Sequence, residues 1–294
     1  MSQALTPNNV HIEYETFGSR VNPPLVLIQG LGAHMLGWHH DFCRFIADRG
    51  FFVIRFDNRD VGLSDKFPNA HYTVADMAAD TAGLLTALGI EASHIVGQSM
   101  GGMIAQQLAI DYPQRVLSLT LIYTSPDSDN IIGADILRER SVIPHATNRQ
   151  EAVDAYVLNE APCAGPAYPH DAQWLRTLGG LMYDRNYDPD GVDRQRKAIT
   201  GPDDRMPALT RLSIPTLIIH GDSDALISHT GSEAIHKAIR GSELKIYPGM
   251  GHQLPRELWT DIINRLKENA TRADTASTTN GNPHNTEPAP RARS

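Results

Sequence analysis

Cysteine is scarce in this sequence, and basic residues neither outnumber acidic ones nor form clusters. Only Cys43 and Cys163 occur in 294 residues, which excludes a disulfide framework and the paired-cysteine spacing of a metal site. The net charge of −8 argues against nucleic acid or an anionic membrane as a partner. No apolar run approaches the roughly 18 residues of a membrane helix, and residues 1–9 do not read as a signal peptide. These absences predict a cytoplasmic protein without nucleic-acid or membrane partners.

The chain alternates apolar strand-like runs with amphipathic helical patterns. An edge strand is expected at 10–17, followed by runs at 25–28, 51–56, 95–96, 117–123, 215–220 and 244–247. Helical patterns fall at 40–49, 73–88, 100–112, 232–239 and 257–268. This alternation predicts the α/β class, with a doubly wound, mostly parallel sheet.

The alternation lapses between residues 125 and 209. That span is rich in Pro, Asp and Tyr and shows helical patches near 136–139, 151–158 and 172–181 without a clear strand. We predict a helical cap inserted into a core formed by residues 1–124 and 210–270. Residues 271–294 have almost no large apolar side chains, so a disordered tail is expected there.

The most informative motif is Gly97-Gln98-Ser99-Met100-Gly101, which follows the strand-like Ile95-Val96 and opens a helical pattern. Strand, Gly-x-Ser-x-Gly and helix in this order predict a nucleophile elbow, a sharp turn with the serine at its apex. Side chains at the two glycine positions would clash where strand and helix converge. The beginning of the helix also presents free N–H groups beside the serine hydroxyl.

Polar residues follow the predicted strands at the points where they end. Gln29, Asp57, Ser99 and Thr124 each come directly after an apolar run. Parallel strands end at the same edge of a sheet, and ligands bind outside that edge. We therefore expect these residues to meet at a single site.

A serine nucleophile needs a base to take its proton and an acid to orient that base. His252 lies in a glycine-rich loop after the last strand, where the imidazole can be brought over the sheet edge. Asp222 and Asp224 both follow the preceding strand, and we favour Asp224 because it lies far enough from the strand to curl back. The order Ser99, Asp224, His252 is that of the α/β-hydrolase triad.

Across residues 10 to 270 the chain resembles the α/β-hydrolase fold superfamily. The motifs Gln29-Gly-Leu-Gly32, Leu36-Gly-Trp38, Phe56-Asp-Asn-Arg-Asp-Val-Gly-Leu-Ser64 and Gly249-Met-Gly-His252 resemble bacterial carboxylesterases of the aclacinomycin methylesterase type. The resemblance implies an oxyanion hole formed by the backbone N–H groups of Leu31 and Met100. Many relatives have His-Gly where this chain has Gln29-Gly30, a change that affects hydrogen bonding around this loop, and many have a proline where it has Ile227-Ser228.

Other polar residues near the motifs have simpler explanations. For the loop residues Asp57, Arg59 and Asp60 we favour internal ion pairs and turn hydrogen bonds over substrate contact. We interpret His220 as a core histidine whose hydrogen-bonding groups have partners, and Asp80 as a solvated or capping residue. Three further histidines are expected at the surface or facing the cap: His34, His39 and His40.

Substrate contacts are harder to assign. Gly30 of the oxyanion loop and four residues of the predicted cap are the candidates, although packing between cap helices explains the four equally well: Tyr156, Trp174, Met182 and Tyr183.

These observations favour a serine carboxylesterase that acts on small to medium carboxylic esters through an acyl-enzyme, without a metal or an organic cofactor. Three other activities use the same triad: hydrolysis of carbon–carbon bonds, lactone hydrolysis and cofactor-free perhydrolysis. A ligand-binding receptor on the same fold is the non-enzymatic alternative. We expect a small-molecule ester as the partner and either a monomer or a homodimer.

Overall fold

Eight strands form one sheet in the order β1-β2-β4-β3-β5-β6-β7-β8. The pairs β1–β2 and β2–β4 are antiparallel, and every later neighbour is parallel, which confirms the doubly wound, mostly parallel sheet. The computed structural model describes residues 1–133, 136, 145–201 and 204–279. β1, a short edge strand, was not predicted. The strands are β1 (Ser2–Leu5), β2 (His11–Phe17), β3 (Pro24–Ile28), β4 (Phe52–Phe56), β5 (Ser93–Gln98), β6 (Val116–Ile122), β7 (Thr216–Gly221) and β8 (Glu243–Tyr247).

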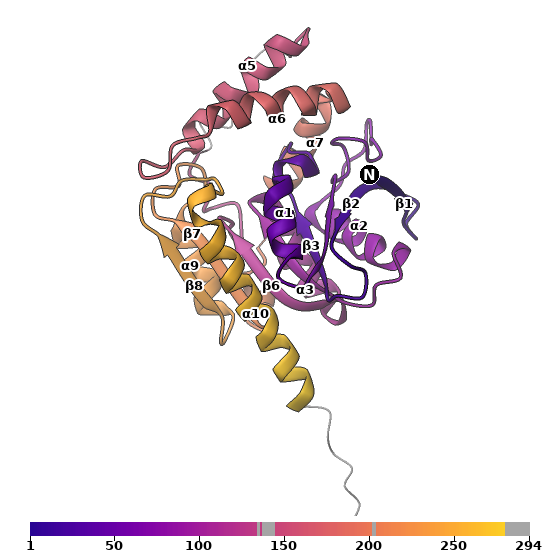
Figure 1. The fold of residues 1–294 in the computed structure, drawn as a ribbon, viewed down its shortest axis with the longest axis vertical. Coiled ribbons are helices and arrows are strands. Elements are labelled where there is room, and N and C mark those ends of the chain that lie inside the picture. The colour runs from indigo at the N-terminus through magenta and orange to yellow at the C-terminus, as the bar shows by residue number, and fades with distance from the viewer. Residues whose placement is uncertain (134–135, 137–144, 202–203, 280–294) are drawn as a thin grey trace, which may run out of the picture.

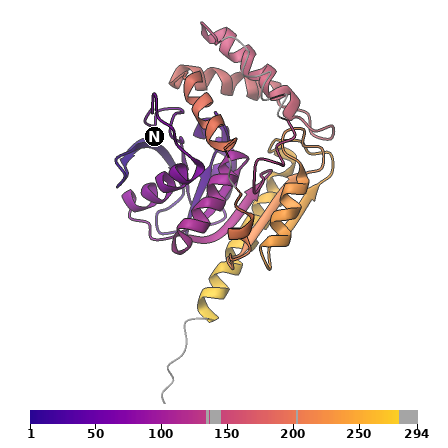
Figure 2. The same ribbon diagram turned by 180° about the vertical axis from the view of Figure 1, so that it is seen from behind.

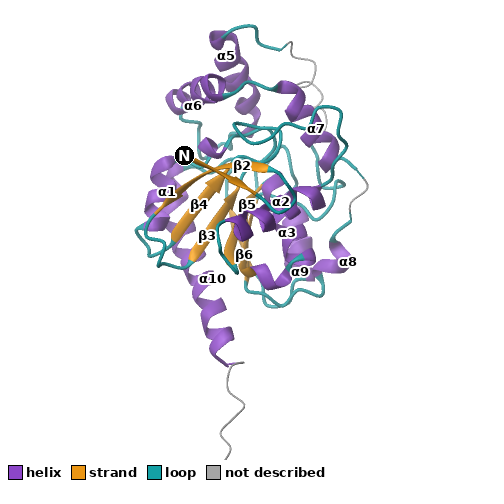
Figure 3. Cartoon of the chain, turned by 90° about the vertical axis from the view of Figure 1, so that its right-hand side faces the viewer, coloured by secondary structure: helices purple, strands orange, loops and turns teal. Residues whose placement is uncertain are grey.

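Helices cover both faces of the sheet (Figure 3). Alternate residues of a strand point to opposite faces, so that in β3 Val26 and Ile28 pack toward one layer and Leu25 and Leu27 toward the other. The first layer contains α2 (Val74–Ala87), α3 (Met100–Asp111) and α9 (His229–Ala238). The second contains α1 (His40–Ala47) and α10 (Trp259–Thr279). Two apolar layers therefore hold the sheet as a fixed platform.

α10 continues beyond the predicted end of the core at residue 270. It extends to Thr279, and on its extension Arg272 Nη1 donates to Glu243 Oε1 over 2.7 Å. Residues 271–279 are thus helical and not part of a disordered tail. The rest of the predicted tail, 280–294, lies outside the described residues.

Among the described residues, three helices lie beyond the sheet, at the end of the molecule opposite the last turns of α10 (Figures 1 and 2). They are α5 (Arg149–Glu160), α6 (Ala172–Arg185) and α7 (Pro189–Ile199), and we refer to them as the cap helices. α7 was not predicted, and most of the expected patch at 136–139 is outside the described residues. The short helix α8 (Met206–Leu209) packs against α3 and α9 instead.

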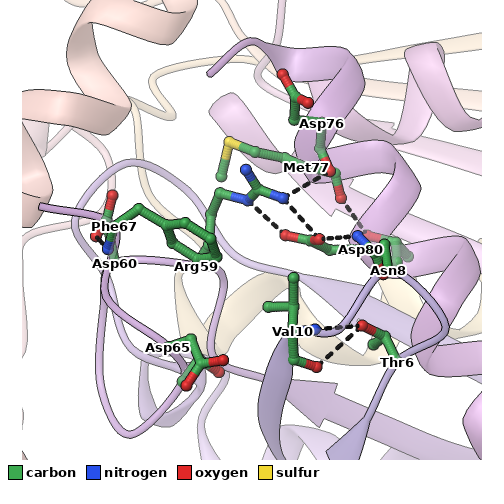
Figure 4. A network of polar contacts seen from close by, with 12 residues as sticks. Thr6, Asn8, Val10, Arg59, Asp60, Asp65, Phe67, Asp76, Met77 and Asp80 are labelled. Atoms are coloured by element: carbon green, nitrogen blue, oxygen red, sulfur yellow. Dashed lines mark hydrogen bonds and ion pairs between the residues drawn. The ribbon is translucent and has the colours of Figure 1, made fainter. Parts of the chain in front are cut away.

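An ion pair between Arg59 and Asp80 joins the loop that follows β4 to α2 (Figure 4). The guanidinium donates to both carboxylate oxygens, over 2.6 and 2.7 Å, and Asn8 donates to the same carboxylate over 2.8 Å. Asp80 is only 2% exposed, so its interpretation as a solvated or capping residue was wrong. Its apolar helical neighbours gave no indication of a charged partner in another loop.

Among the described residues, no helix combines the length and the apolar character that crossing a bilayer requires.

Candidate active site

Ser99 stands at a sharp turn between β5 and α3. Its backbone has φ 54° and ψ −124°, a conformation that L residues rarely adopt and that persists only where the surroundings enforce it. A Cβ on Gly97 would lie 2.1 Å from the carbonyl oxygen of Gly101, and one on Gly101 would lie 2.2 Å from that of Ile28. Strand and helix therefore approach more closely than any side chain allows, and the hydroxyl of Ser99 projects from the edge of the sheet.

Hydrogen bonds link Ser99, His252 and Asp224. Ser99 Oγ lies 2.9 Å from His252 Nε2, and His252 Nδ1 lies 2.7 Å from Asp224 Oδ2. Since a carboxylate only accepts, Nδ1 carries the proton and Nε2 is left as an acceptor for the serine hydroxyl. The three residues come from the loops after β5, β7 and β8, and the structure brings them together as the sequence predicted.

Asp224 is held by three further hydrogen-bond partners besides His252. Its Oδ1 accepts from the backbone N–H groups of Leu226 and Ile227, over 2.8 and 2.9 Å, and its Oδ2 lies 3.1 Å from His220 Nε2. Burial alone would raise the pKa of this carboxyl, but the charge of His252 and hydrogen bonds from both histidines hold the pKa well below its usual range. The side chain is therefore a buried acceptor that is ionised at neutral pH.

Two neighbouring residues complete this loop. His220 is buried and satisfied, as predicted, but its contact with Asp224 was not foreseen. Asp222, the alternative acid, is exposed and accepts from the N–H of Gly249 over 2.7 Å. It shapes the loop that carries His252, and among the described residues no hydrogen bond joins it to the imidazole.

The loop after β3 lies directly against Ser99. A Cβ on Gly30 would stand 3.2 Å from Ser99 Cβ, and Leu31 is the next residue of the chain and lines the same cavity as Ser99. Met100 is the first residue of α3, where N–H groups have no intrahelical acceptor. Of the two residues expected to supply oxyanion donors, Met100 directly follows Ser99 and Leu31 directly follows the glycine packed against it.

A chain of side-chain hydrogen bonds supports this loop from below. Tyr123 donates to Gln98, Gln98 donates to Gln29, and Gln29 Oε1 accepts from the N–H of Gly30 over 2.8 Å. Gln29 stands where many relatives have histidine, and here its amide holds the backbone just before Leu31. The ring of Tyr123 also lies 4.6 Å from that of His252.

A cavity of about 640 Å³ opens above Ser99 between the sheet edge and the cap helices. All five residues expected to contact substrate line it, as do Ser99, His252 and Leu31. Its walls also contain residues that the sequence did not single out, including Val192 and Ile199 of α7. Their apolar spacing in a short polar helix was the only available signal.

Ion pairs join the loop after β4 to the cap helices. Asp57 and Asp60 are fully buried, and they pair with Arg185 at 2.9 Å and with Arg194 at 2.7 Å. The expectation of internal ion pairs in this loop is confirmed, but both arginines come from the cap helices. They fasten α6 and α7 to the core beside the cavity.

The three histidines near the oxyanion loop differ in their environments. His40 is exposed, whereas the ring of His39 lies 4.2 Å from that of Trp174 on α6. His34 is only 5% exposed and lines the cavity, so it is not a surface residue. Burial lowers its pKa from the ordinary value of 6.5 to about 4, and Arg185 adds to this effect against the opposing charge of Asp57.

The sheet order, the strained serine and its hydrogen-bonded histidine and aspartate define a protein with the architecture of an α/β hydrolase. The model of the alpha/beta hydrolase fold family matches residues 23–255, and the chain belongs to this family.

Several curated proteins are similar over most of their length. Rhodomycin D methylesterase DauP of Streptomyces sp. (strain C5) is 27% identical, with 86% of this chain and 93% of that protein covered. The 3-oxoadipate enol-lactonase 2 of Acinetobacter baylyi is 28% identical, with 82% and 86% covered. Among solved structures, the enol-lactonase of Burkholderia xenovorans superposes with a TM-score of 0.74 at 21% identity, covering 92% of this chain and all of that one. At this identity, the comparison of structures supports the fold alone.

Proposed function

We propose that this protein is a serine carboxylesterase that hydrolyses small to medium carboxylic esters. The observation that carries the proposal is the hydrogen-bonded series from Ser99 Oγ through His252 to Asp224 at the floor of the cavity. Curated relatives that include a methylesterase and an enol-lactonase support ester chemistry over other uses of the fold. A serine at the apex of the elbow disfavours dehalogenase and epoxide hydrolase chemistry, which needs a carboxylate there.

In the proposed cycle Ser99 Oγ attacks the ester carbonyl while His252 Nε2 takes its proton. The negative charge that develops on the carbonyl oxygen is stabilised by the N–H groups of Leu31 and Met100, each worth about 3 kcal/mol in comparable sites. His252 then protonates the leaving alcohol, and the acyl-enzyme remains. Water activated by the same imidazole releases the acid, while Asp224 orients His252 and stabilises its cation.

Five cavity residues are proposed to contact the substrate. Gly30 lies nearest the serine, and the side chains of the cap helices form the more distant wall: Tyr156, Trp174, Met182 and Tyr183. This wall is apolar and aromatic, which suits the hydrocarbon part of an ester. No metal or organic cofactor takes part in the cycle.

Turnover of p-nitrophenyl esters from acetate to laurate tests the proposal, with wild type measured beside Ser99→Ala. Removal of the nucleophile is expected to lower turnover by about 10⁶-fold, since triad members act as a unit. A fluorophosphonate should label wild type and not the variant. Turnover that survives in Ser99→Ala within tenfold would contradict the mechanism. Labelling without turnover would favour a carbon–carbon substrate or a receptor.

A further inference from the structure

Gln195 is a cap residue that reaches the loop of the proposed oxyanion hole. It lies on α7 and is fully buried. Its Oε1 accepts from the N–H of Gly32 over 2.9 Å, and its Nε2 donates to the carbonyl oxygen of Arg59 over 2.7 Å. One amide thus connects a cap helix with two separate loops of the core.

α7 packs closely against the two core loops that Gln195 joins, the loop after β3 and the loop after β4. A Cβ on Gly32 would stand 2.9 Å from Cγ1 of Val192, and the φ of +69° at Gly32 is a conformation that glycine adopts without strain. On the other side, a Cβ on Gly191 would stand 2.1 Å from the carbonyl oxygen of Asp60. At both points the helix is in direct contact with a core loop, so the position of the loop that contains Gly32 depends on that of α7.

The two glutamines bracket Leu31. Gln29 accepts from the N–H of Gly30 on one side, and Gln195 accepts from the N–H of Gly32 on the other. Each peptide unit is planar, so an N–H fixed on either side leaves the intervening Leu31 little freedom to rotate. The core supplies the first constraint and the cap helix supplies the second.

We infer that Gln195 is a positioning residue that aims the N–H of Leu31 at the developing oxyanion. The inference rests on the proposed serine esterase function. A loop with Gly30 and Gly32 on either side of its donor is intrinsically flexible, and stabilisation of the transition state requires a donor that is already in place. The cap helices then serve catalysis as well as substrate selection, because α7 supplies the second constraint on the donor through Gln195.

The test compares Gln195→Met with wild type on the best p-nitrophenyl ester. Methionine keeps the length of the side chain but loses both hydrogen bonds. We expect kcat to fall about 10- to 100-fold, in line with the effect of misplacing a reacting group by about 1 Å, with KM changed less than about twofold. The inhibition constant of a trifluoromethyl ketone, which forms a tetrahedral oxyanion on Ser99, should rise by the same factor as kcat falls.

Arg194→Met is the matched control. Arg194 is the adjacent residue of α7 and binds Asp60 in the loop after β4, over 2.7 and 2.9 Å. Among the described residues no hydrogen bond or ion pair joins it to residues 30–33. It should lower the melting temperature while kcat stays within about threefold. Gln195→Glu keeps an acceptor for Gly32 and should recover most of the kcat lost in Gln195→Met. If Gln195→Met does not fold, Gln195→Asn, which is one methylene too short, takes its place under the same criteria.

Three outcomes would overturn the inference. The first is a kcat within twofold of wild type in Gln195→Met, and the second is an equal loss of kcat in Arg194→Met. The third is an inhibition constant that does not follow kcat. In each of these the wild type still hydrolyses the ester and reacts with a fluorophosphonate, so the proposed function stands. A wild type that does neither overturns both proposals together.

Discussion

His220 and His252 both contact Oδ2 of Asp224, at 3.1 and 2.7 Å. His220 Nε2 also lies 3.1 Å from the carbonyl oxygen of Ile227, and because both partners only accept, this nitrogen carries a proton. A carboxylate shared by two imidazole N–H groups cannot rotate away from the histidine that faces Ser99. The orientation of His252 therefore depends, through Asp224, on a histidine inside β7.

Replacing His220 with leucine should lower kcat by roughly 10- to 100-fold, the equivalent of losing one hydrogen bond to a charged group. KM should change little, because His220 does not line the cavity. His94→Leu is a suitable control, since His94 is also buried in a strand and pairs with a serine, Ser118, at 2.9 Å. Steady-state kinetics at one pH give kcat and KM for both variants and for wild type. Equal losses of kcat in the two variants would show that only stability had been affected.

Asp224→Asn and Asp222→Asn separate the two candidate acids. The first should reduce turnover by about 10⁴-fold, because an amide in place of the carboxylate no longer holds the required tautomer of His252. The second removes part of a contact to the N–H of Gly249 and should cost about threefold or less. Rates on the same ester, with melting temperatures measured in parallel, test the assignment. A larger loss in Asp222→Asn would mean that the acid is Asp222.

The sequence predicted the parts of the site whose signals are local. Ser99 is recognised because a strand, two glycines and a helix follow each other within a few residues, and Asp224 and His252 follow strands of the same sheet. Gln195 has no comparable signal, since it bonds to Gly32 across 163 residues and sits in a polar helix that reads as solvated. The same holds for Arg185 and Arg194, whose partners are buried aspartates of another loop. Long-range polar contacts leave no periodic trace in a sequence.

For the ion pair between Arg59 and Asp80 we predict that removing one partner lowers the free energy of unfolding more than replacing both partners does. Asp80→Ala leaves a largely buried guanidinium without its carboxylate and should lower the free energy of unfolding by about 3–5 kcal/mol. Arg59→Met combined with Asp80→Leu replaces both charges by apolar groups and should recover most of that loss. Urea denaturation at neutral pH measures both. If the double variant is as unstable as Asp80→Ala, the pair contributes through its hydrogen bonds to Asn8 and the backbone instead.

His34 predicts how stability depends on pH between neutrality and about 4.5. Its pKa is depressed in the folded protein from 6.5 to about 4, so the unfolded chain takes up a proton in this interval while the folded protein resists it. The contribution of His34 to the free energy of unfolding is therefore fully present above pH 6.5, and it is lost as the pH decreases toward 4. Carboxyl groups with lowered pKa, such as that of Asp224, act below this window.

Wild type should lose about 2–3 kcal/mol more of its free energy of unfolding than His34→Gln between pH 7 and 4.5. Glutamine does not titrate, so the difference between the two proteins isolates His34 from the other groups. His40→Gln serves as the matched control, because it removes an exposed histidine, 55% accessible, and leaves His34 in place. Urea midpoints measured across the interval provide the comparison. Parallel curves for wild type and His34→Gln would show that His34 takes up its proton as readily in the folded protein as in the unfolded chain.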